Sequence, residues 1–302
     1  MQNLPFGQPG RFFRGNLHTH STVSDGAMSP DEVIKAYRAN GYDFIALTDH
    51  FRERFGFPVT DTRSYRDDEF TTILGAELHP PALENGEDWH ILAVGLPLDF
   101  PAASQDEDGP GLAARARDAG AYVAIAHPHW YSATIGDARS IGSAHAVEIF
   151  NQTCHMANDR GYGWYLADLL LAEGRRVMAI GTDDAHSKPE RPDMFACWVM
   201  VKAETLDPDD LLASLHRGHF YTSQGPYIHD ITISRDHSNV TIETSPVDSV
   251  QVSGRAQRTR DHHGHGITTC TIDLDRVQGD HFRVTVIDTF GRRAWSNPIW
   301  LE

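Results

Sequence analysis

The sequence predicts an α/β barrel over residues 1–226, followed by a small all-β sandwich module over residues 227–302. Three observations support this prediction. Helix-like and strand-like segments alternate through the first part, which is typical of a parallel sheet. Polar residues that bind metals follow the ends of several predicted strands, as they do at the mouth of a barrel. After residue 226 the helix signals vanish and short runs rich in Thr, Val and Ile take over.

The first helix–strand unit has clear boundaries. Ser29 begins a Ser-Pro-Asp-Glu segment, which supplies an N-cap, a proline in the first turn and a capping-box glutamate. Gly41 stands where this helix should end. The apolar run Phe44–Thr48 then predicts a buried strand that leads directly into Asp49 and His50.

The same order recurs along the chain. Further helices are predicted at Gly111–Ala119, Tyr162–Ala172 and Asp207–His216. Roughly seven barrel strands are expected, and the others lie near Phe12–Leu17, Thr72–Leu74, Ile91–Leu96, Tyr122–Ala126, Ala146–Phe150, Val177–Ile180 and Cys197–Val201. The sandwich strands are predicted at Ile231–Ile233, Val240–Glu243, Ser249–Val252, Thr268–Ile272 and Phe282–Ile287.

Composition excludes several classes of function. The 26 Lys and Arg against 42 Asp and Glu give a formal charge of -16, which argues against a basic face for nucleic acid or acidic membranes. Bound metal ions would reverse the sign locally, so an anionic substrate stays compatible with this charge. No apolar run approaches the ~20 residues of a membrane span, and Met1–Gly10 lacks a signal pattern, so we expect a cytoplasmic protein.

Histidines and carboxylates dominate the predicted strand ends. His18 and His20 stand two residues apart, which places both imidazoles on one face of an extended segment. A set of such residues in this pattern predicts a metal site, and its mixed ligands suit Zn, Mn or Fe. The candidate set is His18, His20, Asp25, His50, Glu77, His90, His127, Asp184 and His186.

These motifs resemble those of the PHP (polymerase and histidinol phosphatase) family. Seven short motifs occur in the family's order over about residues 14–190, and such a set is far more specific than any one motif. They are His18-Thr19-His20-Ser21, Ser24-Asp25-Gly26, Leu47-Thr48-Asp49-His50, Gly75-Ala76-Glu77, His90-Ile91-Leu92, Ala126-His127-Pro128 and Asp184-Ala185-His186.

The resemblance implies a distorted (β/α)7 TIM-like barrel that binds two to three divalent metal ions at its mouth. Glu77 would bridge two of these ions. The family pattern divides the ligands into His18, His20, Glu77 and Asp184 for one ion, Glu77, His90 and His127 for a second, and Asp25, His50 and His186 for a third. Histidinol-phosphatase-like members have histidine where Asp25 stands, which disfavours histidinol phosphate as the substrate.

The expected reaction is hydrolysis of a small phosphate mono- or diester. Two ions sharing Glu77 and supported by Asp184 would hold a bridging hydroxide for in-line attack on phosphorus. The leaving oxygen would receive its proton from His129, or from His50 if the third ion is absent. One of four loop cations would contact the substrate: Arg52, Arg54, Lys188 or Arg191.

Other readings stay open at this point. The barrel-plus-sandwich order also resembles the carbaryl-hydrolase-like branch of the family, which implies a carboxyl ester or carbamate substrate. A non-catalytic partner domain is a third reading, disfavoured by the complete ligand set and the acidic charge. Asp49 is expected to orient a ligand and not to bind the ion itself. Glu148 could support a metal-bound histidine, but a plain strand-end carboxylate is the simpler interpretation, and His79 receives no role. His262, His263 and His265 are read as a solvated loop.

Overall fold

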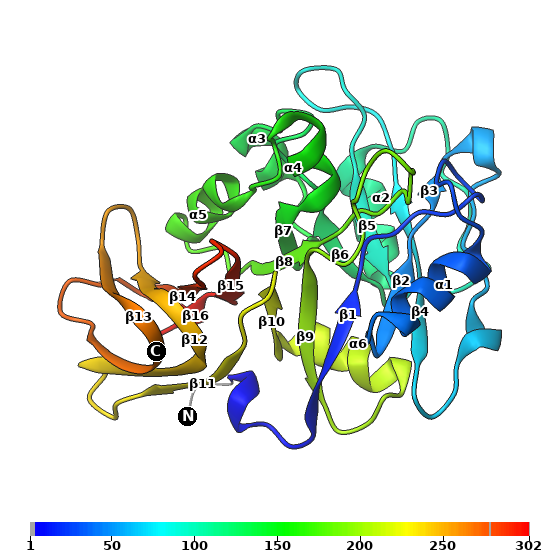
Figure 1. The fold of residues 1–302 in the computed structure, drawn as a ribbon. Coiled ribbons are helices and arrows are strands. Elements are labelled where there is room, and N and C mark those ends of the chain that lie inside the picture. The colour runs from blue at the N-terminus through cyan, green and yellow to red at the C-terminus, as the bar shows by residue number, and fades with distance from the viewer. Residues whose placement is uncertain (1–3, 278, 302) are drawn as a thin grey trace.

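A computed structural model describes residues 4–277 and 279–301. One twisted sheet runs through both parts of the chain, in the order β11-β12-β14-β15-β10-β9-β1-β2-β4-β5-β6-β7-β8 (Figure 1). The first ten strands are β1 (Arg11–Asn16), β2 (Phe44–Leu47), β3 (His50–Phe51), β4 (Thr71–Leu78), β5 (Ile91–Val94), β6 (Tyr122–Ile125), β7 (Ala146–Asn151), β8 (Met178–Thr182), β9 (Trp198–Ala203) and β10 (Phe220–Ser223).

The C-terminal strands are β11 (Ile228–Ile233), β12 (Asn239–Ser253), β13 (Thr259–Asp273), β14 (His281–Ile287), β15 (Arg293–Ser296) and β16 (Ile299–Trp300). The helices are α1 (Pro30–Ala39), α2 (Gly109–Asp118), α3 (Ile135–Ser140), α4 (Gln152–Asn158), α5 (Trp164–Ala172) and α6 (Pro208–Arg217), with short 3-10 turns η1 (Pro5–Gly7), η2 (Glu53–Phe55) and η3 (Arg63–Tyr65). None of the helices among the described residues has the length and apolarity to span a bilayer.

The expectation of a parallel sheet holds for only part of the barrel region. The pairs β1–β2, β2–β4, β6–β7 and β7–β8 are parallel, whereas β5 is antiparallel to both β4 and β6. Parallel neighbours need a crossover, usually a helix, and no helix lies between β4 and β5 in the described chain. β9 likewise follows β8 without a helix and runs antiparallel to β1. The sheet is therefore mixed, with fewer helices than a regular (β/α)7 barrel has.

The sheet curves so that β8, the strand at one end, approaches β10 in its interior. The backbone N–H of Gly181 in β8 donates to Thr222 Oγ1 in β10 at 3.1 Å, and that hydroxyl donates to Ala179 O at 3.1 Å. Inside the curve, buried side chains from β1, β2, β5 and β8 form one cluster with Leu211 and Leu215 of α6. The concave side is thus filled by packed side chains beneath the strand ends, as in a barrel.

The first predicted helix is confirmed. Ser29 caps α1, because its hydroxyl accepts from the Glu32 N–H at 3.3 Å and the Glu32 carboxylate accepts from the Ser29 N–H at 2.8 Å. Its buried stripe of Val33, Ile34 and Tyr37 belongs to the same apolar cluster as Ile45 and Leu47 of β2. This packing sets the position of β2, which leads into Asp49 and His50.

The C-terminal strands are antiparallel and continue the same sheet, because β15 pairs with both β10 and β14. The two strands predicted at 240–243 and 249–252 are parts of one long strand, β12. The reading of His262, His263 and His265 as a loop is wrong, since they lie in β13, the partner of β12 in a long hairpin. A domain boundary near residue 226 stays a prediction.

Candidate metal centre

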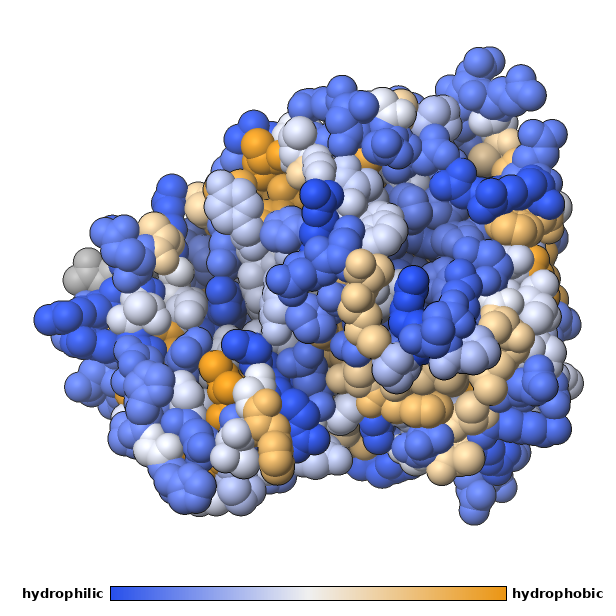
Figure 2. Space-filling model, turned by 45° about the horizontal axis from the view of Figure 1, so that its top comes forward, coloured by the Kyte–Doolittle hydropathy of each residue, from blue (hydrophilic) through white to orange (hydrophobic). Residues whose placement is uncertain are grey.

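The predicted ligands gather at one edge of the sheet, where the parallel strands end. β1 leads to His18 and His20, β4 carries Glu77, and β8 leads to Asp184 and His186. This edge is the upper part of Figure 1, and Figure 2, turned so that the top comes forward, shows a largely hydrophilic face there. The structure thus brings residues from distant parts of the sequence into one site.

His90 reaches this edge for a reason that the sequence did not reveal. It stands just before β5, at the start of the strand and not at its end. Because β5 is antiparallel to β4 and β6, its start lies beside their carboxyl ends. The Nδ1 atom of His90 consequently lies 2.8 Å from Oε1 of Glu77.

Glu77 is the centre of the cluster and is fully buried. Its Oε1 also lies 3.0 Å from Nε2 of His127, and its Oε2 lies 2.6 Å from Nδ1 of His50 and 3.3 Å from Nε2 of His79. Burial alone would raise the pKa of this carboxyl, but the surrounding imidazoles outweigh burial and hold the pKa well below its usual value. Glu77 therefore stays ionised and offers one oxygen to each side of the site.

Asp184 faces the histidines of the first motif. Its Oδ1 lies 3.0 Å from Nε2 of His20 and 3.2 Å from Nε2 of His18. Its backbone adopts a left-handed conformation with φ of 51°, which few residues other than glycine adopt readily but which Asp tolerates. Asn151 donates from Nδ2 to Oδ2 at 3.1 Å, so the carboxylate is held in one orientation.

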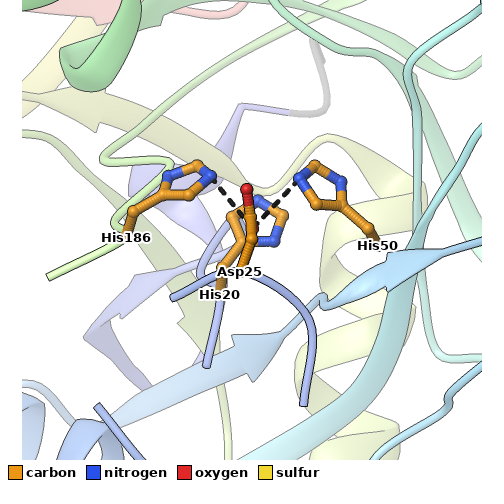
Figure 3. Close-up of side chains that lie close together, drawn as sticks. All are labelled: His20, Asp25, His50 and His186. Carbon is orange, nitrogen blue, oxygen red and sulfur yellow. Dashed lines mark ion pairs between the residues drawn. The ribbon is translucent and has the colours of Figure 1, made fainter. Parts of the chain in front are cut away.

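A further group surrounds Asp25. Figure 3 shows His50 and His186 pointing at its carboxylate from two sides, with His20 beside it. Oδ1 of Asp25 lies 3.3 Å from Nε2 of His50 and 3.4 Å from Nε2 of His186. Burial would lower the pKa of His50, but Glu77 and Asp25 outweigh it and raise the pKa to about 10. The resemblance assigned His20 to a different ion, and the structure places it close to this group as well.

Two carboxylates support the ligands from behind. Glu148 is buried and lies 3.1 Å from Nδ1 of His18, and it accepts the backbone N–H of His127 at 2.7 Å. Asp49 accepts the N–H of Ser21 at 2.7 Å and the hydroxyl of Ser24 at 2.7 Å, which fixes the turn that carries Asp25. Both carboxylates hold ligands in place.

The arrangement fits divalent metal ions. Nε2 of His18 is buried without a hydrogen-bond partner, although it lies 3.2 Å from Oδ1 of Asp184 and 3.6 Å from Oε1 of Glu77. An ion bound at about 2.0–2.2 Å keeps its ligand atoms roughly 3–4 Å apart, so these spacings suit coordination. The groups whose ligand atoms lie within 4.8 Å of one another are His20–Asp25–His50–His186, His18–His127–Asp184, His18–His20–Glu77, His50–Glu77–His79 and Glu77–His90–His127.

A pocket of about 300 Å³ opens onto this cluster. Besides ligand candidates it is lined by Trp130, Thr153, Cys154, Lys188 and Arg191. Two of the four predicted substrate cations, Lys188 and Arg191, therefore face the pocket.

The other two predicted cations and His129 are not among the lining residues of the described chain. Arg52 contacts Asp88, and the guanidinium of Arg54 lies 4.6 Å from the centre of the Phe55 ring. His129 is half-buried, and burial together with Arg160 lowers its pKa.

One residue of the cluster, His79, is absent from the ligand set predicted from the sequence. Its side chain is fully buried, and its Nε2 lies 2.7 Å from Nδ1 of His50. A signal was present, because His79 follows Glu77 by two residues at the end of a strand, and alternation places both on the same face.

Comparison with known proteins gives the chain its family. The PHP domain model matches residues 16–265. A segment of 88 residues, 29% of this chain, is 34% identical to the DNA polymerase/3'-5' exonuclease PolX of Bacillus subtilis and covers 15% of that protein. A segment of 116 residues, 38% of this chain, is 32% identical to an uncharacterised protein of Methanocaldococcus jannaschii and covers 45% of it. The chain thus spans less than half the length of either relative.

A solved structure shares the fold along nearly the whole chain. It is a two-domain protein from Bacteroides vulgatus, described as containing a predicted PHP-like metal-dependent phosphoesterase. The likeness covers 93% of this chain and 92% of that one, with a TM-score of 0.56 and 19% sequence identity. The family match over most of the chain, together with the cluster of His, Asp and Glu at the strand ends, shows that this chain belongs to the PHP domain family.

Proposed function

We propose that this chain is a metal-dependent phosphoesterase that hydrolyses a small phosphate mono- or diester. The observation that carries the proposal is the buried Glu77 carboxylate, whose two oxygens face separate histidine groups. A shared carboxylate of this kind suits a pair of ions, which is a frequent arrangement in phosphatases and nucleases. The description of the Bacteroides protein as a PHP-like metal-dependent phosphoesterase supports the same class.

Two to three divalent ions, Mn, Zn or Fe, would be held by the nine predicted ligands. When bound, such ions supply the Lewis acidity that activates water and offsets the charge of the phosphoryl group. The histidines and carboxylates would fix where the ions lie, since Glu148 contacts the ring of His18 and Asp49 holds the turn that carries Asp25. His18, for example, is held through Nδ1, so only Nε2 points into the site.

Lys188 and Arg191 would bind the anionic substrate. Both line the pocket beside the Asp25 group. Their segment is anchored by the buried Asp193, which accepts the N–H of His186 at 2.9 Å and that of Ser187 at 3.1 Å. Two cations on an anchored loop counter the charge of a phosphate ester, despite the net charge of -16 of the whole chain.

The leaving-group proton is better assigned to His50 than to His129. Burial and the nearby Arg160 lower the pKa of His129, which disfavours the protonated ring, and this side chain is not among the lining residues of the pocket in the described chain. His50 lines the pocket, and its pKa of about 10 keeps it protonated in the metal-free protein. It would act as the acid only in a form that leaves the third ion site empty.

A substrate panel tests the proposal. We expect the metal-loaded protein to release p-nitrophenol from p-nitrophenyl phosphate or bis-p-nitrophenyl phosphate, to lose this activity on chelation and to regain it with Mn or Zn. Asp184→Asn should abolish turnover without unfolding the protein. Preference for p-nitrophenyl acetate would instead support a carboxyl ester or carbamate hydrolase, and bound metal without turnover of any ester would support a binding role.

A further inference from the structure

One aromatic side chain of the pocket has no partner within the described chain. Trp130 lines the pocket beside the candidate metal ligands and is 37% exposed. Its hydrogen bonds use backbone atoms only, and among the described residues no ring or cation lies against its indole. We propose that Trp130 determines specificity, because its indole stacks on a planar aromatic ring in the organic part of the ester, an inference that rests on the proposed function.

The other five tryptophans show how unusual this placement is. Three of them lie under an arginine guanidinium and two are only 2% exposed: Trp164, Trp198 and Trp300 in the first group, Trp89 and Trp295 in the second. Covering the face of an exposed indole is favourable, because a large apolar area leaves water. Trp130 therefore offers a ligand a face that the described residues leave uncovered.

The turn that carries Trp130 is fixed by hydrogen bonds. The N–H of Trp130 donates to the carbonyl oxygen of His127 at 2.9 Å, and Nη1 of Arg160 donates to the carbonyl oxygen of Trp130 at 3.4 Å. The next residue, Tyr131, is buried, and its hydroxyl donates to the carbonyl oxygen of Ala126 at 2.7 Å. A platform whose backbone is already ordered loses little conformational entropy when a ligand binds.

The rest of the pocket favours an aromatic ring over a cation or a sugar. Cations also bind indole faces, but Lys188 and Arg191 line the same pocket and would repel a cationic group. A sugar needs hydrogen-bond partners for its hydroxyls. The hydroxyl of Thr153 already donates to the carbonyl oxygen of Asp184 at 2.8 Å, and the thiol of Cys154 is a weak donor. A neutral planar ring needs neither a counter-charge nor these hydrogen bonds.

The two parts of such an ester would face different residues of the pocket. The phosphoryl group would lie at the ligand histidines and carboxylates, with Lys188 and Arg191 to counter its charge, and the ring would lie against Trp130. The pocket volume of about 300 Å³ is at the lower end of the range for small-molecule sites, roughly 300–1,000 Å³. The pocket therefore suits a compact ester with a single ring system.

Binding of non-hydrolysable phosphonates to the full-length protein loaded with Mn²⁺ tests the inference without turnover. Phenylphosphonate, cyclohexylphosphonate and methylphosphonate carry the same anionic group, so the ratios of their dissociation constants report on the organic part. Calorimetric titration at a pH where each is a dianion measures these constants. We expect phenylphosphonate to bind about tenfold more tightly than methylphosphonate, and more tightly than cyclohexylphosphonate, because stacking requires a flat ring.

Variants of Trp130 assign this preference to the indole. Trp130→Ala should reduce the preference for phenylphosphonate over methylphosphonate to about twofold or less, and Trp130→Phe should retain part of it. Trp130→Leu keeps an apolar side chain, so it should lose only the preference for phenylphosphonate over cyclohexylphosphonate. Tyr165→Ala is the matched control, because Tyr165 is an exposed aromatic residue of α5 that is not among the pocket-lining residues, and it should keep the parent ratios.

Three results would overturn the inference. The first is an unchanged ratio of phenylphosphonate to methylphosphonate affinity in Trp130→Ala. The second is cyclohexylphosphonate binding to the parent protein at least as tightly as phenylphosphonate, because apolar area alone would then explain the affinity. The third is no binding of any of the three phosphonates. A ratio that depends on Trp130 in a protein that hydrolyses no phosphate ester would contradict the proposed function alone, and hydrolysis with a ratio independent of Trp130 would contradict this inference alone.

Discussion

Replacing Glu148 with glutamine should weaken metal binding although Glu148 is not itself a predicted ligand. Its carboxylate contacts four hydrogen-bond donors: Nδ1 of His18, the hydroxyl of Thr182, the backbone N–H of His127 and Nδ2 of Asn151. One carboxylate oxygen faces His18 and Thr182, and the other faces His127 and Asn151. A glutamine amide must turn its NH₂ group toward one of these two pairs of donors. If the NH₂ faces His18, the imidazole must accept at Nδ1 and carry its hydrogen on Nε2, the atom needed for the ion.

The size of the effect follows from the bond that is lost. A hydrogen bond to a charged group contributes about 1.5–3 kcal/mol, and about 1.4 kcal/mol corresponds to a factor of ten. Glu148→Gln should therefore raise the dissociation constant of the tightest ion by about 10–100-fold, the usual range for such supporting residues. Titration calorimetry with Zn²⁺ or Mn²⁺ measures it, and Glu173→Gln, an exposed carboxylate paired with Arg139, is the control. An affinity within a factor of three of the parent would refute this reasoning.

Three further predictions concern the pocket, the pH response and the core. Lys188→Met and Arg191→Met should each raise KM by about tenfold with little change in kcat, because both side chains line the pocket and neither is a predicted ligand. Steady-state kinetics measures this, and a fall in kcat alone would contradict it. Metal affinity should rise with pH between about 7 and 9, because His50 has a pKa of about 10 and an ion that binds to it must displace the proton of its ring. Calorimetric titrations in buffers of different ionisation enthalpy measure the protons released, and no proton release on metal binding would contradict this prediction. Leu170→Ala, at a fully buried position of α5, should lower the free energy of unfolding by about 2–5 kcal/mol in urea denaturation, and a loss below 1 kcal/mol would show that the site is not closely packed.

Much of the site could be predicted because local patterns determine it. The Ser29 capping box begins α1, and the strands that lead into His50 and His186 are short apolar runs whose ends the sequence marks. The order of the motifs brings their residues to one edge of the sheet once those strands are parallel neighbours. Local sequence thus suffices for residues that directly follow a parallel strand.

The remaining features depend on strand direction and on contacts between distant loops. Nothing local in the sequence showed that β5 runs antiparallel, which is what brings His90 to the site. Arg52 follows a ligand motif as a substrate cation would, yet Asp88, which lies far along the chain, draws it toward His79. The orientation of Arg52 depends on these tertiary contacts, which the local sequence pattern does not determine.

Metal counting on the purified protein and on Glu77→Gln tests the central claim most directly. Inductively coupled plasma mass spectrometry of the protein loaded with Mn or Zn should find two to three ions per chain. In Glu77→Gln the count should fall by at least one and phosphate ester hydrolysis should be lost, because both oxygens of Glu77 face ligand histidines. An unchanged count in Glu77→Gln, or a wild-type protein that hydrolyses phosphate esters at full rate with less than one ion per chain, would contradict the account.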